Sequence, residues 1–163
     1  MEPSAMRLKR TLIFTVLLAG LGYLIYTALP PSSDGLAAVE KLATVDEFSL
    51  GHVGLRGPIP KREDWFITIL RSRHADRLFS LLYRRGTPAA RSYALAGLRL
   101  TDMSTYRRCA ADYSATTVTL RTAGGCYVHE GVSPVSIVQA FDSGAVEDYM
   151  KDRDRLYMNW PHE

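Results

Sequence analysis

The two cysteines of this chain have the most readily specified chemistry. Cys109 and Cys126 are the only cysteines among the 163 residues. In an oxidising compartment an isolated pair forms a disulfide, which here would close a loop of about 17 residues and contribute roughly 3 kcal/mol through chain entropy. The alternative is two buried free thiols that act as small apolar side chains. We predict the disulfide.

A catalytic alternative takes Cys126 as a nucleophile and His129 as its base. Residues three apart on a strand point to opposite faces, which disfavours this pair. The sequence His129-Glu130 lacks a second histidine four residues on, so it is not a zinc-protease helix. The other three histidines have no ligand spacing with it, and no G-x-S-x-G elbow occurs. We therefore predict no catalytic residue, no metal ligand and no cofactor.

The compartment is indicated by an uncharged apolar run over residues 11–29. At about 1.5 Å per residue, this run spans roughly 28 Å as a helix, close to the hydrocarbon thickness of a bilayer. Arg7, Lys9 and Arg10 precede it, and the next basic residue is Lys41. The positive-inside rule then places the N-terminus in the cytoplasm and the rest of the chain outside it.

A cleaved signal peptide is the alternative interpretation of this run. The sequence Gly35-Leu36-Ala37 is the best candidate cleavage site, although the apolar region is long for this class. Both interpretations export the domain. We predict a single-pass protein of the inner (cell) membrane, with secretion to the periplasm as the alternative.

The charge of the chain argues against a nucleic-acid partner. The formal net charge is +3, but residues 32–163 carry 17 basic and 16 acidic side chains. Residues 61–108 hold 11 basic and 4 acidic side chains, whereas residues 109–163 hold 4 and 8. One explanation is solvated helix faces with attraction between the two halves; the other is a basic face directed at anionic headgroups or an acidic partner.

Apolar periodicity predicts a mainly helical domain interrupted by a short β-hairpin. Thr87 with Pro88, Asp102, and Ser133 with Pro134 are typical helix starts, and Gly86 is placed to end a helix in the left-handed region. The hairpin is expected from strands 116–122 and 126–129. The run 48–60 has glycine at every third position and is expected to be irregular. The expected helices cover residues 36–43, 63–70, 74–85, 88–100, 103–113, 133–141 and 145–151.

Residues 81–98, LLYRRGTPAARSYALAGL, resemble the turn and second helix of a HEAT-type repeat, and the likeness extends over about residues 74–101. The runs FSLGHVGLRG and AARSYALAGLRLTD, with the later GGC, also resemble small exported bacterial proteins of no assigned role. A HEAT-like unit implies a protein-binding scaffold without catalytic residues. The hairpin would interrupt a longer array of such repeats.

These features together predict how the chain is divided and what it does. A basic cytoplasmic segment (1–10), a transmembrane helix (11–29) and a linker (30–35) would precede a helical domain (36–155) and a tail (156–163). The membrane helix would contact the lipid bilayer, and the domain would bind an unidentified protein of the bacterial envelope in a scaffold, inhibitor or immunity role. The alternative is a small envelope hydrolase or thiol enzyme with an unidentified site.

Overall fold

The computed structural model describes residue 20 and residues 29–51, 60–124 and 127–157, with side chains up to residue 153. Its contacts divide the chain into two compact units, Met1–Pro30 and Pro31–Glu163. The predicted membrane helix lies outside the described residues except for its positions 20 and 29, and so do Arg7, Lys9 and Arg10. No helix within the described ranges has the length and apolarity needed to cross a bilayer.

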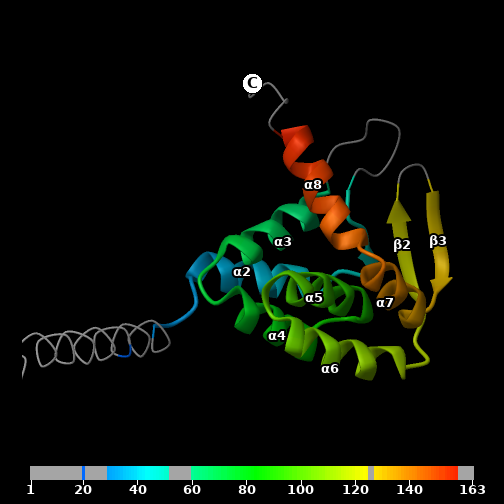
Figure 1. Ribbon diagram of the computed structural model, residues 1–163, viewed down its shortest axis with the longest axis horizontal. Helices are drawn as coiled ribbons and strands as arrows, with labels where there is room; N and C mark the ends of the chain where they lie inside the picture. Colours follow the sequence, from blue (N-terminus) through cyan, green and yellow to red (C-terminus); the bar gives the residue numbers. More distant parts are fainter. Residues whose placement is uncertain (1–19, 21–28, 52–59, 125–126, 158–163) are drawn as a thin grey trace, which may run out of the picture. The chain divides into compact units, whose positions relative to one another are not determined.

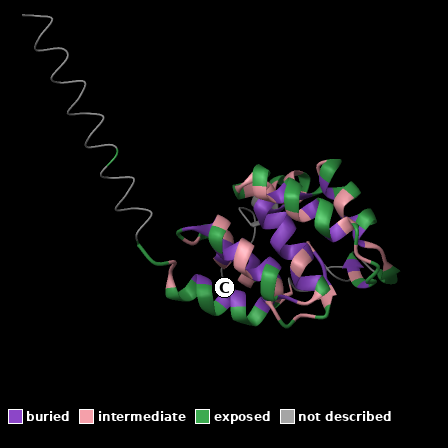
Figure 2. Cartoon of the chain, turned by 90° about the horizontal axis from the view of Figure 1, so that it is seen from below, coloured by how far each residue is buried: buried purple, intermediate pink, exposed green. Residues whose placement is uncertain are grey.

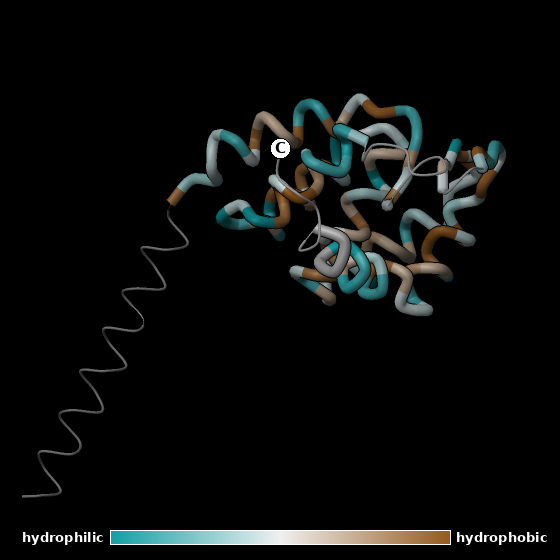
Figure 3. Tube along the Cα trace, turned by 90° about the horizontal axis from the view of Figure 1, so that it is seen from above, coloured by the Kyte–Doolittle hydropathy of each residue, from teal (hydrophilic) through white to brown (hydrophobic). Residues whose placement is uncertain are grey.

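The second unit is mainly helical, as predicted, with a small three-stranded sheet (Figure 1). Polar and apolar residues alternate along its helices, as expected for helices that bury one side (Figure 3). The described helices are α2 (Ser33–Leu42), α3 (Lys61–Arg71), α4 (Ala75–Arg85), α5 (Pro88–Thr101), α6 (Met103–Ser114), α7 (Pro134–Asp142) and α8 (Ala145–Tyr157). The strands are β1 (Glu47–Phe48), β2 (Leu120–Gly124) and β3 (Tyr127–Val132).

Side-chain caps fix where several helices begin. The side-chain oxygens of Ser32, Thr87, Asp102 and Ser133 each accept a hydrogen bond from the backbone N–H three residues on, at 3.1–3.2 Å. These bonds satisfy donors that a helix start otherwise leaves unpaired. The predicted starts of α5, α6 and α7 are therefore confirmed, while α2 begins three residues before its expected position.

The core is built around α5, in which every residue from Ser92 to Leu98 is buried (Figure 2). A Cβ added at Gly97 would lie 2.3 Å from the ring of Phe79 on α4, so α4 and α5 pack closely there. Phe66 on α3 packs against Phe79 and Tyr93, with ring centroids 5.5 and 6.1 Å apart. Three helices thus meet in one aromatic cluster.

Gly86 ends α4 as predicted, but the expected left-handed conformation is wrong. Its φ is −80° and its backbone is extended. A Cβ at this position would lie 2.6 Å from Cβ of Ala90 and 2.8 Å from the carbonyl oxygen of Leu82. Glycine is therefore required by the close approach of α5 to the end of α4 and not by a positive φ.

The sheet has the order β1-β2-β3. The predicted hairpin is present, but its strands lie a few residues further along the chain than expected, and 116–119 are not part of β2. Strand β1 was not predicted. It pairs in parallel with β2, with Glu47 opposite Arg121 and Phe48 opposite Thr122.

The last helix extends six residues beyond its expected end. The charged run KDRDR from Lys151 to Arg155 is expected from its sequence to be solvated, but Arg153 is only 8% exposed. Helix α8 packs against α5 and α7, and its Tyr149 is hydrogen-bonded to Glu63 of α3, so it is not a freely solvated helix. The solvated prediction is therefore wrong for Arg153.

Candidate interaction surface

Exposed apolar side chains of the domain concentrate around the β2–β3 hairpin. Of the seven large apolar side chains that are exposed among the described residues, two lie on β3, one lies two residues before β2, and one lies three residues after β3. We call these four residues the hairpin surface. They are Val118 (39% exposed), Tyr127 (71%), Val128 (49%) and Val135 (41%).

Strand β3 exposes every residue from Tyr127 to Gly131. It is one of the two edge strands of the sheet, and its residues pair only with β2 (Figure 1). The Tyr127 ring stacks on His129, with centroids 6.2 Å apart, and neither residue is covered by a helix. Exposed apolar side chains on an edge strand promote aggregation of an isolated domain, and they commonly mark an interaction site.

A bulge limits how β3 can pair with another strand. The register shifts between Leu120 and Thr122 of β2, and Gly131 opposite this region has a φ of +74°. Such irregularities bend an edge strand and discourage continuous pairing with a further strand. The regular part of the free edge is therefore short, and recognition by the hairpin must rely mainly on side chains.

Polar contacts hold the base of the hairpin on the helices. Arg121 of β2 forms an ion pair with Glu47 at 3.2 Å, and Arg62 of α3 also binds Glu47. The Tyr93 hydroxyl accepts a hydrogen bond from the Ser49 backbone N–H (2.9 Å) and donates one to the Ser49 carbonyl (2.6 Å). Burial raises the pKa of Tyr93, so this hydroxyl stays protonated and able to donate.

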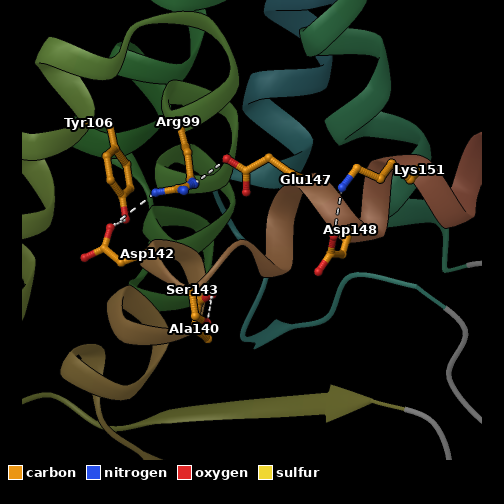
Figure 4. Close-up of polar contacts among 8 residues, drawn as sticks. All are labelled: Arg99, Tyr106, Ala140, Asp142, Ser143, Glu147, Asp148 and Lys151. Atoms are coloured by element: carbon orange, nitrogen blue, oxygen red, sulfur yellow. Dashed lines mark hydrogen bonds and ion pairs between the residues drawn. The ribbon is translucent and has the colours of Figure 1, made fainter.

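A second polar cluster ties α7 and α8 to α5 and α6 (Figure 4). Arg99 Nε lies 2.7 Å from Glu147, and its Nη1 lies 3.2 Å from Asp142. The Tyr106 hydroxyl donates to Asp142 at 2.8 Å, and the guanidinium lies over the Tyr106 ring. Burial, with the Asp142 carboxylate, raises the pKa of Tyr106 to about 12. One guanidinium faces two carboxylates here, and its ion pairs with Asp142 of α7 and Glu147 of α8 position these helices on α5.

Glu63 is a buried carboxylate in the first turn of α3, where a negative charge favours the start of a helix. It is only 1% exposed. One of its oxygens accepts a hydrogen bond from the Gly51 backbone N–H at 3.1 Å, and the other accepts one from the Tyr149 hydroxyl. Glu63 therefore joins α8 to the beginning of the glycine-rich run, of which 52–59 lie outside the described residues.

The predicted disulfide stays a prediction. Cys109 is half-buried on α6, and its carbonyl oxygen accepts a hydrogen bond from Tyr83 at 2.9 Å. Burial raises the pKa of this thiol. Cys126 lies outside the described residues.

The other residues with possible chemistry are not brought together. His129 is exposed on β3, whereas His74 is buried at the corner before α4. Ser133 caps α7 through the N–H of Ser136. Within the described ranges, no three His, Cys, Asp or Glu side chains are grouped to hold a metal ion.

Comparison of the chain with protein-family models, with curated proteins and with solved structures finds no match. The likeness of residues 74–101 to a HEAT-type repeat therefore rests on their sequence pattern. The hairpin surface was missed because alternating residues predict a half-buried strand, whereas both faces of β3 are exposed. Glycine at position 131, next to Glu130, was the available sign of a bulged edge.

Proposed function

We propose that this chain is a non-enzymatic protein-interaction module and that the hairpin surface binds its partner. The observation that carries the proposal is the exposure of Tyr127 and Val128 on a strand open to solvent on both faces. Tyrosine is enriched among the residues that contribute most to protein binding, because it buries a large apolar ring and keeps a polar end. The partner is a protein that offers an apolar pocket to Tyr127.

In this proposal, residues 11–29 anchor the chain in the inner membrane and place the domain in the envelope. The helical body, with its HEAT-like segment at 74–101, is the scaffold that holds the hairpin. A scaffold, inhibitor or immunity role would use the same surface. All three predict a stoichiometric complex with one envelope protein.

The thiol-enzyme alternative takes Cys126 as its nucleophile, which lies outside the described residues, and the surroundings of the other cysteine, Cys109, do not favour a nucleophile. A nucleophilic cysteine needs a lowered pKa, which a nearby cation or helix N-terminus provides. Burial instead raises the pKa of Cys109. The exposed His129 stacks on the Tyr127 ring.

Site-specific photo-crosslinking of the full chain in native membranes tests the proposal. A benzophenone amino acid would replace Tyr127 in one sample and Met103, an exposed apolar residue on α6, in the control. We expect one discrete adduct from position 127 and none from position 103. We also expect Tyr127→Ser to weaken the purified complex by roughly 30-fold, the effect of one strong interface residue. Equal crosslinking from both positions, or none from position 127, would overturn the proposal.

A further inference from the structure

The basic half of the domain exposes nearly all of its charge. Of the 11 Lys and Arg residues between positions 61 and 108, eight are exposed. Of the four acidic residues in this stretch, only Asp64 is exposed, since Glu63 is buried and the other two are partly covered. The exposed surface of this half is therefore strongly positive.

Attraction between the two halves of the domain explains little of this charge. Arg99 pairs with the acidic half, through Asp142 and Glu147. Among the described residues, no ion pair involves Arg84, Arg85, Arg107 or Arg108. Their charges remain available to an outside partner.

Helix contacts gather several of these arginines in one place. The Tyr83 hydroxyl, in the last turn of α4, donates to Asp112 at 2.7 Å and to the Cys109 carbonyl at 2.9 Å. Arg91 lies over the Tyr83 ring, 5.7 Å from its centroid. The Asp112 carboxylate accepts its hydrogen bond from the neutral Tyr83 hydroxyl, so it adds one negative charge beside the arginines. The residues beside this contact form the arginine face, which consists of Arg84, Arg85, Arg91 and Arg108.

We infer that the arginine face binds the phosphates of anionic lipid headgroups. Guanidinium groups match phosphate oxygens in geometry and charge. The predicted membrane helix ends at Leu29 and α2 begins at Ser33, and the three residues between them span at most about 11 Å. The linker therefore keeps the domain near the headgroups, where weak electrostatic contacts act at high local concentration. This inference rests on the membrane anchor of the proposed function, but the site is separate from the hairpin surface.

The test uses the full chain in lipid nanodiscs of phosphatidylcholine, with or without phosphatidylglycerol. We expect amide hydrogen exchange over residues 80–112 to be slower in the anionic discs, with the difference lost at high salt. Arg84→Gln with Arg85→Gln should lower the ratio of docked to undocked domain by roughly 20- to 30-fold, about fivefold for each arginine. The matched control is Lys41→Gln with Lys151→Gln, which removes two exposed charges elsewhere and should keep the protection.

Two outcomes would overturn this inference. Equal exchange over residues 80–112 in neutral and anionic discs would exclude lipid binding by the arginine face. Protection that appears in neutral discs only when an oligonucleotide or polyglutamate is added would assign the face to another polyanion. Crosslinking at Tyr127 is unaffected by either outcome, so the two proposals fail separately.

Discussion

Helix α5 and strand β3 place similar side chains in opposite surroundings. Tyr93 of α5 is fully buried and its hydroxyl is hydrogen-bonded to Ser49, whereas Tyr127 of β3 is 71% exposed and contacts His129. The helical body is ordered by the packing of its side chains around the buried helix α5. The hairpin is instead ordered by backbone pairing and by contacts at its base, including the ion pair of Arg121. Its side chains are consequently free to contribute to binding without contributing to folding.

The largest loss of stability is expected from substitutions in the aromatic cluster of the helical body. Phe66→Ala should lower the free energy of unfolding by about 3–5 kcal/mol, because it removes a fully buried ring and leaves a cavity. Urea unfolding followed by circular dichroism measures this change. Val128→Ala on β3 is the matched substitution and should cost less than about 0.5 kcal/mol. Similar losses of unfolding free energy at the two positions would contradict the proposed difference between the helical body and the hairpin.

Close packing of α4 and α5 predicts the next largest effect. Gly97→Ala places a methyl group 2.3 Å from the Phe79 ring and should cost about 1–2 kcal/mol, even after the better helix propensity of alanine. Gly124→Ala, at the end of β2, meets nothing within 4 Å and is the control. Melting temperatures of the two variants measure the difference. An unchanged melting temperature of the Gly97→Ala variant would show that α4 and α5 can move apart at little cost in free energy.

The polar cluster of Figure 4 predicts a pH dependence. Because the folded-state pKa of Tyr106 is raised from 10.0 to about 12, its contribution is fully present below pH 10 and is lost as the pH rises towards 12. The loss by pH 11 is at most about 1.4 kcal/mol, since about one of the two pKa units is expressed there and one unit corresponds to about 1.4 kcal/mol. Urea unfolding at pH 8 and pH 11 would measure it. Tyr106→Phe should reduce this pH dependence. An equal fall in unfolding free energy between pH 8 and pH 11 in both proteins would show that Tyr106 is not its source.

The smallest effect on stability is expected from the hairpin surface. Tyr127→Ser with Val128→Ser should change the free energy of unfolding by less than about 0.5 kcal/mol, because both side chains are already largely in water. The midpoint of urea unfolding is the measurement. A clear destabilisation would show that these side chains support the fold, and the hairpin would then resemble the helical body.

Local signals in the sequence predicted most of the helical body. Thr87, Asp102 and Ser133 cap their helices with their own side chains, so the residue type alone indicates the start. Gly86 was placed correctly for a wrong reason, because its close approach to Ala90 depends on how α5 packs.

Features that depend on distant contacts could not be predicted. Strand β1 has two residues, Glu47 and Phe48, too few for an alternating pattern, and it exists because β2 lies beside it. Burial of Glu63 and Arg153 depends on α8, which packs on elements far away in the chain. The exposed faces of β3 likewise reflect what the helices fail to cover.

The parallel pairing of β1 with β2 also has a kinetic consequence. Glu47 and Arg121 are partners across 74 residues of chain, whereas β2 and β3 pair across a short turn. Closing a long loop costs entropy that must be offset by structure already formed between its ends. The hairpin can therefore form early and alone, while β1 joins it only after α3 to α6 have collapsed. Addition of the two-residue strand is then a late step, which reports that the helical body has finished folding.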